Sequence, residues 1–253
     1  MQNAALEALG LGGEWTYGSL DLEPAEFVDR VRELPGEGYV GVNVTIPHKR
    51  AALELADQAS KAATEIGAAN TLSFADGVTH AENTDAIGLL SALPEPPAGK
   101  RALVLGAGGS ARAAVWALEG QAGSVCVWNR TPERAAELVR DLPDSQGRLA
   151  SVSEDEARSG PFDLVVNCTA VGMDGEDPFE HLPLDPDRIG DDMTLVDLVY
   201  VGGESRLVRE ARERGASVVD GLEVLVQQGG ESLRLWTGMD PPLDVMREAV
   251  RNG

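Results

Sequence analysis

Two short polar stretches of the sequence carry side chains that could move a proton. The first is NVTIPHK at residues 43–49, which ends in Lys49, and the second is NTDAIG at residues 83–88, which contains Asp85. A lysine and a carboxylate close together can donate and accept the proton of a hydroxyl group, as the oxidation of an alcohol requires. The pattern alone leaves two simpler roles open, since Lys49 could be an exposed lysine at a helix start and Asp85 a helix N-cap.

The rarity of lysine supports a special role for Lys49. The chain has 21 basic residues, and all but Lys49, Lys61 and Lys100 are arginines. The sequence therefore uses arginine where any cation suffices, and a lysine inside a motif can be there for its ammonium group. The alternative is that Lys49 has been retained by chance.

A glycine-rich stretch, RALVLGAGGSARAA at residues 101–114, is typical of a nucleotide site. Residues 102–105 are an apolar run that predicts a buried strand, and helical spacing begins at Ser110. Gly106, Gly108 and Ala111 fit the dinucleotide pattern in its G/A form, in which N–H groups at a helix N-terminus hold a pyrophosphate. A plain glycine turn into a helix would have the same short pattern.

The end of the next predicted strand, residues 124–128, indicates which dinucleotide would bind. An NAD site usually has a carboxylate there, about 20 residues past the loop, on the ribose 2′-hydroxyl. This sequence has no carboxylate at the strand tip, and Arg130 and Arg134 follow. One charged hydrogen bond of roughly 1.5–3 kcal/mol to a 2′-phosphate would favour NADP about tenfold to a hundredfold. Two solvated arginines are the alternative, which the helix dipole disfavours.

The elements that must position these residues form two groups, separated by a Pro-rich linker at residues 94–97. Before the linker, periodicity and turn signals predict a mixture of strands and helices. The expected strands are 15–20, 39–44, 70–74 and 78–81, the last two as a hairpin, and the expected helices are 3–10, 24–34, 47–55, 58–66 and 85–93.

After the linker, strands and helices alternate, which predicts an α/β fold with a parallel sheet covered on both faces. From Gly221 the pattern is helical to the end, apart from a break at 238–242. The expected strands are 101–105, 124–128, 162–166, 193–199 and 216–219, and the expected helices between them are 109–119, 131–140 and 204–214.

Length and composition bound the class of protein. With 253 residues, 43% hydrophobic and 25% charged, the chain is typical of a globular protein with one large or two modest domains. A net charge of −21 without a basic block excludes nucleic acid and anionic membranes as partners. We find no membrane-spanning run and no signal-peptide pattern. We therefore expect a cytoplasmic protein with a small-molecule substrate, with Cys126 and Cys168 as buried thiols and without metal-ligand spacing among its histidines.

The motifs together resemble the shikimate dehydrogenase family, with its quinate/shikimate relatives. The resemblance runs in order along nearly the whole chain, and it makes catalytic roles for Lys49 and Asp85 the favoured interpretation. It is carried by NVTIPHK (43–49), GAANTL (67–72), NTDAIG (83–88), GAGGSAR (106–112), NRTPERA (129–135), NCTAVGM (167–173), DLVYV (197–201) and GLEVLVQQG (221–229).

The resemblance implies reversible reduction of 3-dehydroshikimate to shikimate with NADPH, a step of aromatic amino acid and chorismate biosynthesis. Lys49 matches the family's catalytic lysine and Asp85 the aspartate paired with it, and either could be the base for the reverse direction. The matched substrate contacts are Thr45, Asn70, Asp85, Tyr200 and Gln228. The matched cofactor contacts are Gly106, Ala107, Gly108, Gly109, Ser110, Asn129, Arg130, Thr131, Arg134, Leu198 and Gly221.

The resemblance also implies two domains. Residues 1–85 plus 222–253 would form an N-terminal α/β substrate-binding and catalytic domain, to which the C-terminal helices return. Residues 86–221 would form a Rossmann-type NADP-binding domain. The active site would lie in the cleft between them, with closure as a gating step. We expect a monomer or a homodimer.

The N-terminus departs from the family. The family begins with a glycine-rich strand and a Ser-x-Ser segment before Met-His-Asn, whereas this chain begins Met1-Gln2-Asn3. Those serines hold the substrate carboxylate in the family, so we expect impaired substrate affinity through truncation and an unpaired sheet edge. The alternatives are a short relative that reduces a different polyol or keto-acid, and a weakly catalytic NADP-binding protein. The retained Lys49, Asp85, Asn70 and Gln228 argue against the latter.

Overall fold

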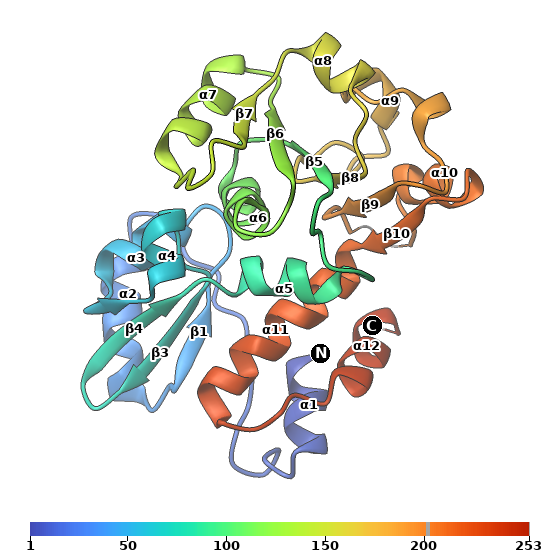
Figure 1. Cartoon of the computed structure of the whole chain (residues 1–253). Coiled ribbons are helices and arrows are strands. Elements are labelled where there is room, and N and C mark those ends of the chain that lie inside the picture. The colour runs from blue at the N-terminus through green and yellow to red at the C-terminus, as the bar shows by residue number, and fades with distance from the viewer. Residues whose placement is uncertain (201–202, 253) are drawn as a thin grey trace. The chain divides into compact units, whose positions relative to one another are not determined.

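A computed structural model of the chain describes residues 1–200 and 203–252 (Figure 1). The chain folds into two compact units, Met1–Gly88 with Leu225–Gly253 (unit 1) and Leu89–Val224 (unit 2). Both boundaries fall inside helices, α5 (Thr84–Ala92) and α11 (Gly221–Thr237). The chain therefore passes into unit 2 along α5 and returns to unit 1 along α11.

Unit 1 is built on a four-stranded sheet in the order β1-β3-β4-β2. Strands β3 (Thr71–Ala75) and β4 (Val78–Glu82) form the predicted hairpin. Asp76 and Gly77 between them have φ of 53° and 75°, as in the type I′ turn that Asp-Gly favours. β1 (Gly41–Asn43) pairs antiparallel with β3 at one edge, and β2 (Gln58–Ala59) pairs parallel with β4 at the other.

Helices cover one face of this sheet. Phe27, Ala52, Ala63 and Leu72 are buried together between the helices and the strands. These helices are α2 (Phe27–Glu33), the 3-10 turn Leu34–Glu37, α3 (Lys49–Leu55) and α4 (Lys61–Ile66).

A second apolar cluster in unit 1 joins its N-terminal and C-terminal helices. Leu6 of α1 (Gln2–Ala8), Leu233 of α11 and Met246 of α12 (Leu243–Arg251) are at most 3% exposed and pack together. This cluster joins the part of α11 from Leu225 onward to the other helices of unit 1.

Residues 15–20 do not form the strand that the sequence predicts. An extended segment becomes a strand only when a neighbouring strand takes up its backbone hydrogen bonds, and no strand among the described residues pairs with this one. The side chain of Asn3 does so instead at Tyr17. Asn3 Nδ2 donates to Tyr17 O at 2.9 Å, and Tyr17 N–H donates to Asn3 Oδ1 at 2.7 Å.

The helix expected at 58–66 is wrong in its first turn. Residues 58–59 form β2, whose parallel pairing with β4 overrides their local helical pattern. Ser60 then caps α4, because its Oγ accepts a hydrogen bond from Ala63 N–H. The helix therefore begins at Lys61.

Unit 2 contains a six-stranded parallel sheet in the order β10-β9-β8-β5-β6-β7. The chain starts at β5 in the middle, runs outward to β7, and then returns to build the other side from β8. In such sheets dinucleotides bind at the carboxyl ends of the strands where the order reverses, here between β5 and β8. The strands are β5 (Arg101–Leu105), β6 (Ser124–Trp128), β7 (Leu149–Ser151), β8 (Leu164–Asn167), β9 (Thr194–Asp197) and β10 (Ser217–Asp220).

Both faces of this sheet are buried, as the sequence predicts. Val104 of β5 lies in one apolar cluster with Leu118 and Leu138, and Leu103 lies in a second cluster with Leu195 and Leu207. The α/β fold class is therefore confirmed. The helices are α6 (Gly109–Glu119), α7 (Pro132–Asp141), α8 (Glu154–Ser159), α9 (Pro178–His181), the 3-10 turn Pro186–Arg188 and α10 (Arg206–Glu213).

Within the two described ranges, no helix combines the length and the apolar character needed to cross a membrane.

Candidate active site

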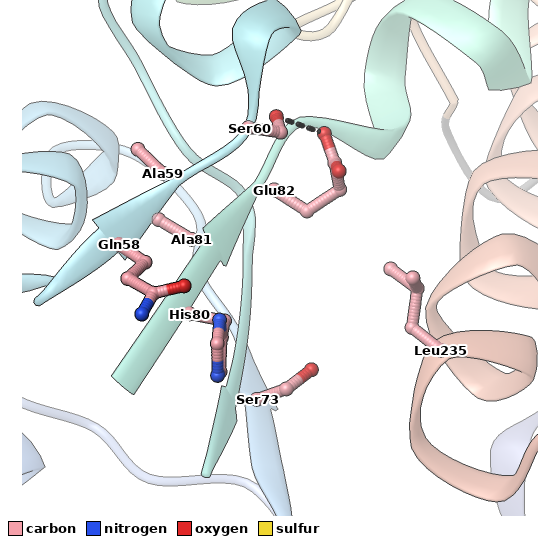
Figure 2. Close-up of a pocket in the computed structure, with 8 residues that line it drawn as sticks. All are labelled: Gln58, Ala59, Ser60, Ser73, His80, Ala81, Glu82 and Leu235. Atoms are coloured by element: carbon pink, nitrogen blue, oxygen red, sulfur yellow. Dashed lines mark hydrogen bonds between the residues drawn. The ribbon is translucent and has the colours of Figure 1, made fainter. Parts of the chain in front are cut away.

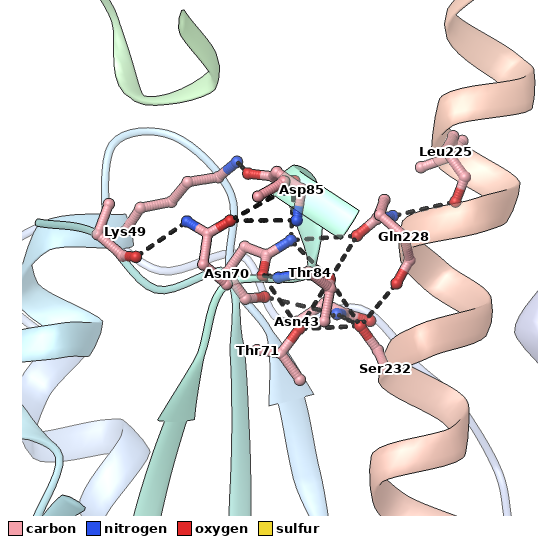
Figure 3. Close-up of polar contacts among 12 residues, drawn as sticks. Asn43, Lys49, Asn70, Thr71, Thr84, Asp85, Leu225, Gln228 and Ser232 are labelled. Atoms are coloured by element: carbon pink, nitrogen blue, oxygen red, sulfur yellow. Dashed lines mark hydrogen bonds and ion pairs between the residues drawn. The ribbon is translucent and has the colours of Figure 1, made fainter. Parts of the chain in front are cut away.

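Lys49 and Asp85 form an ion pair in unit 1 (Figure 3). Lys49 Nζ lies 2.6 Å from Asp85 Oδ2, and the two side chains are only 14% and 19% exposed. Lys49 begins α3 after a turn in which His48 N–H donates to Thr45 O at 2.9 Å. Because its side chain is turned inward onto a carboxylate, the alternative of an exposed helix-start lysine is wrong.

Asp85 is not the N-cap of α5. Asn83 has that role, because its Oδ1 accepts from the N–H groups of Asp85 and Ala86 at 3.2 and 3.4 Å. Asn83 Nδ2 also donates to Ala68 O at 2.9 Å, which ties the start of the helix to the loop before β3. The carboxylate of Asp85 is therefore available for Lys49 and Asn70.

Asn70 holds the second oxygen of Asp85. Its Oδ1 accepts from Thr84 N–H at 2.7 Å, and since a backbone N–H can only donate, the orientation of the amide is determined. Asn70 Nδ2 then faces the carboxylate and donates to Asp85 Oδ1 at 2.8 Å. Both oxygens of Asp85 are thus engaged, one by an ammonium and one by an amide.

Gln228 joins this cluster from α11. Its Oε1 accepts from Asn70 Nδ2 at 3.2 Å, and its Nε2 donates to Leu225 O at 3.1 Å. α11 approaches α5 this closely because residue 88 is glycine: a Cβ there would lie 2.6 Å from Gln228 Cβ. The structure therefore brings together four predicted residues, Lys49, Asp85, Asn70 and Gln228.

Three buried hydroxyl groups lie next to these four residues. Thr71, Thr84 and Ser232 are fully buried, and Ser232 Oγ lies 2.8 Å from Thr71 Oγ1 and 3.2 Å from Thr84 Oγ1. Asn43 Nδ2 donates to Ser232 Oγ at 2.8 Å. We assigned no role to these residues from sequence. Asn43 and Thr84 stand inside the two polar motifs and could have been found there, whereas Ser232 lies in a helix without any such signal.

Two further predicted substrate contacts are Thr45 and Tyr200. Thr45 is exposed in the turn before Lys49. Tyr200 belongs to unit 2, after β9, and is 53% exposed. Both remain predictions.

A separate hollow of about 270 Å³ lies over the sheet of unit 1 (Figure 2). Glu82 in its wall already accepts hydrogen bonds from Ser60 Oγ at 2.5 Å and from Asn83 N–H at 2.8 Å. None of the predicted site residues lines it. Its lining is Gln58, Ala59, Ser60, Ser73, His80, Ala81, Glu82 and Leu235.

The glycine loop of unit 2 has the shape that a pyrophosphate site needs. Gly106 follows β5 with φ 109°, and a Cβ there would lie 3.2 Å from Cys168 O. Ala107 follows, then Gly108 as the extended N-cap of α6, with Gly109 and Ser110 in the first turn. The first N–H groups of a helix lack intrahelical acceptors and can bind a phosphate.

The segment after β6 fits a 2′-phosphate. Thr131 is the N-cap of α7, and Asn129 Nδ2 donates to its carbonyl oxygen at 2.9 Å. Arg130 and Arg134 are exposed, and neither forms an ion pair within the part of the chain that the structure describes. Two available guanidinium groups suit the phosphate that distinguishes NADP from NAD.

Leu198 and Gly221 meet at the carboxyl ends of β9 and β10. A Cβ on Gly221 would lie 2.9 Å from Leu198 O and 3.1 Å from Asp197 O. Only glycine therefore lets α11 begin this close to the end of β9. Among the described residues, no group of three or more histidine, cysteine, aspartate or glutamate side chains could hold a metal ion.

Comparison with known families covers most of the chain. Residues 1–72 match the family description "Shikimate dehydrogenase substrate binding domain". Residues 91–173 match "Shikimate / quinate 5-dehydrogenase", and residues 221–251 match "Shikimate 5'-dehydrogenase C-terminal domain".

Individual relatives are similar over nearly their full lengths. The "Shikimate dehydrogenase (NADP(+))" of Methanothermobacter thermautotrophicus is 40% identical over 99% of this chain and 90% of its own. A crystal structure of shikimate 5-dehydrogenase from Thermus thermophilus, in complex with NADP(H) and shikimate, is 40% identical with a TM-score of 0.87 and covers 99% of this chain and 92% of its own. The 5-ketofructose reductase of a Gluconobacter strain is 29% identical with a TM-score of 0.87 and covers 98% and 91%.

Proposed function

The chain belongs to the shikimate dehydrogenase family, and we propose that it catalyses the reversible NADP-dependent reduction of 3-dehydroshikimate to shikimate. The observation that carries this proposal is the Lys49–Asp85 pair, 2.6 Å apart and held by Asn70. A sheltered ammonium beside a carboxylate can manage the proton that accompanies hydride transfer to a carbonyl group. The relatives named as NADP-dependent shikimate dehydrogenases support the same substrate and cofactor.

The chemistry of the reduction needs one hydride and one proton. NADPH, when bound, supplies the hydride to the carbonyl carbon of the substrate. Lys49 donates the proton to the carbonyl oxygen, on which negative charge develops. Asp85 holds the ammonium in position through its Oδ2. In the oxidation, the same pair takes up the proton of the hydroxyl group.

In this proposal the cofactor is held by residues of unit 2, and the substrate by residues of unit 1 together with Tyr200. Asn70 and Gln228 orient the hydroxyl groups of the substrate through their amides, and Thr45 and Tyr200 add further contacts. The cofactor pyrophosphate lies at Gly106–Ser110, and Arg130 and Arg134 bind its 2′-phosphate. Asn129, Thr131, Leu198 and Gly221 line the remainder of the cofactor site.

The test is NADPH formation from NADP and shikimate, compared between the wild-type protein and Lys49→Ala. We expect kcat to fall by about 10²–10⁴-fold, the usual contribution of a proton-transfer group, with the Kd for NADP unchanged. Lys61→Ala is the matched control, because the Lys61 side chain is 83% exposed on α4. Equal losses in turnover and NADP binding would mean that Lys49 is structural, and a wild-type protein inactive on shikimate would refute the proposed substrate.

A second candidate is reduction of another polyol or keto substrate by the same residues. The observation that favours it is the similarity to the 5-ketofructose reductase. Assays with 5-ketofructose and with 3-dehydroshikimate in parallel decide between the two, because the higher kcat/KM identifies the substrate. NADP binding without turnover of either would favour a non-catalytic role. A cytoplasmic location and a monomeric or homodimeric state complete the proposal.

A further inference from the structure

Asp197 is the most deeply buried carboxylate among the described residues. It ends β9 and is 1% exposed. Its Oδ1 accepts from Asn167 Nδ2 at 2.8 Å and from Val199 N–H at 3.2 Å, and its Oδ2 accepts from Ser205 Oγ at 2.6 Å. The proposed reaction has no use for this group, although a buried carboxylate is costly to maintain.

The partners of Asp197 suit its ionised form, because each of them can donate a hydrogen bond to the carboxylate. Val199 offers a backbone N–H, which can only donate. Ser205 Oγ accepts from Val208 N–H at 3.1 Å and donates its own proton to Asp197 Oδ2. Asn167 Oδ1 accepts from Thr169 N–H at 3.1 Å, which turns Asn167 Nδ2 toward the carboxylate. Burial raises the pKa of Asp197, and these three donors act against that rise.

The charge of Asp197 is solvated by dipoles and is not neutralised by a cation. No lysine, arginine or histidine forms an ion pair with it in the ranges 1–200 and 203–252. Neutral donors and the start of α10 stabilise the anion, but they leave its net charge in place. Because water is excluded, the field of this charge is weakly screened.

Asp197 also lies at the edge of the sheet where the cofactor is proposed to bind. The next residue is Leu198, and the Cβ position of Gly221 is 3.1 Å from Asp197 O. Its partner Asn167 ends the adjacent strand β8, directly before Cys168, whose carbonyl oxygen faces Gly106. One buried anion thus stands between the carboxyl ends of β8 and β9, next to the reversal point between β5 and β8.

From this placement, and resting on the proposed function, we propose that the Asp197 carboxylate makes the cofactor site discriminate between the two redox states of NADP. The nicotinamide ring is positively charged when oxidised and neutral when reduced. A fixed negative charge therefore stabilises bound NADP⁺ relative to bound NADPH. It also stabilises the positive charge that develops on the ring as the hydride leaves, so it assists the reduction of the carbonyl substrate.

The test compares the Kd values of NADP⁺ and NADPH for the intact protein, measured by calorimetric titration without substrate. In Asp197→Asn the ratio Kd(NADPH)/Kd(NADP⁺) should fall by about tenfold, or about 1.4 kcal/mol. Ser205→Ala is the matched control, because it removes a hydrogen bond and a helix cap while it keeps the charge. In that variant both Kd values can rise, but their ratio should stay as in the wild type.

An unchanged ratio in Asp197→Asn, with both Kd values raised equally, would overturn the inference and leave Asp197 a purely structural residue. If Asp197→Asn does not fold by circular dichroism, Asp197→Ser, which leaves room for a water molecule, is measured in its place under the same criteria. Failure of the wild type to bind either form would refute the proposed cofactor site itself. The two failures are therefore distinguishable.

Discussion

Ser232→Ala should destabilise the hydroxyl cluster beside the candidate active site, and it leaves the contacts of Lys49 and Asp85 in place. Ser232 Oγ contacts Asn43 Nδ2 and Thr71 Oγ1 at 2.8 Å each and Thr84 Oγ1 at 3.2 Å, and it is fully buried. It also donates to the backbone oxygen of Gln228 at 3.1 Å. A neutral hydrogen bond contributes about 1 kcal/mol net, and a buried partner left unpaired costs about 1–3 kcal/mol.

The size of the stability loss depends on which partners of Ser232 keep another hydrogen bond in the variant. The hydroxyl groups of Thr71 and Thr84 both lie 3.2 Å from Asn70 Oδ1 and keep that acceptor. Asn43 Nδ2 keeps only Thr71 Oγ1 at 3.2 Å and Asn70 O at 3.5 Å. We therefore expect the free energy of unfolding to fall by about 2 kcal/mol, less than the sum of the lost hydrogen bonds.

Urea denaturation followed by circular dichroism measures this loss, and Ser73→Ala is the matched control. Ser73 is half-buried on the sheet of the same unit, and no hydrogen bond of its side chain is found among the described residues. Because Gln228 lies one turn before Ser232 on α11, the KM for shikimate should rise several-fold, while the Kd for NADP stays unchanged. A loss no larger than that of Ser73→Ala would refute this account of the hydroxyl cluster.

Two further predictions concern unit 2. Arg130→Ala with Arg134→Ala should abolish the preference for NADP over NAD, because both guanidinium groups are exposed and unpaired in the described residues. Arg140→Ala is the control, because Arg140 lies on the same helix as Arg134 and is 70% exposed. An unaltered NADP/NAD ratio of kcat/KM would place the phosphate site elsewhere. Asp163→Asn should lower the melting temperature at neutral pH, because the Arg101 N–H, which donates to Asp163 Oδ2 at 2.8 Å, holds the pKa of this carboxyl below its usual value. This stabilisation is complete above the unfolded pKa of about 3.9 and is lost as the pH falls through the lower folded value. The two melting curves should therefore converge in acid, and a constant difference down to pH 3 would contradict the assignment.

The candidate catalytic residues could be predicted from the sequence because they lie in recognisable local motifs. Lys49 and Asp85 each stand in a short polar stretch between apolar segments, and the hairpin turn at Asp76-Gly77 follows from backbone preference alone. What sequence could not supply is their pairing. The 2.6 Å contact depends on how α3 and α5 pack, because they follow β1 and β4, which lie on either side of β3. No local sequence pattern encodes this packing.

The errors also have a physical pattern. The segment 15–20 alternates as a strand should, but strand formation is decided by a partner, and Asn3 provides the bonds of Tyr17 through its side chain. The local pattern of residues 58–59 predicts a helix, but these residues form a strand because they pair with β4. Ser232 was missed because a single hydroxyl in a helix carries no signal until the neighbouring strands bring Asn43 and Thr71 to it. In all three cases the outcome depends on a hydrogen-bond partner that is distant in the sequence.

Unit 1 is built from two separate stretches of the chain, and this affects the order in which the protein folds during synthesis. Unit 2 is one continuous stretch, Leu89–Val224, whereas unit 1 combines Met1–Gly88 with Leu225–Gly253. Domains generally fold as units during synthesis, from the N-terminus onward. Unit 2 can therefore fold before the part of α11 that belongs to unit 1 has been synthesised, whereas Met1–Gly88 cannot complete its fold until then. Gln228 and Ser232 follow unit 2 in the sequence, so the candidate active site is assembled only after unit 2 has been synthesised.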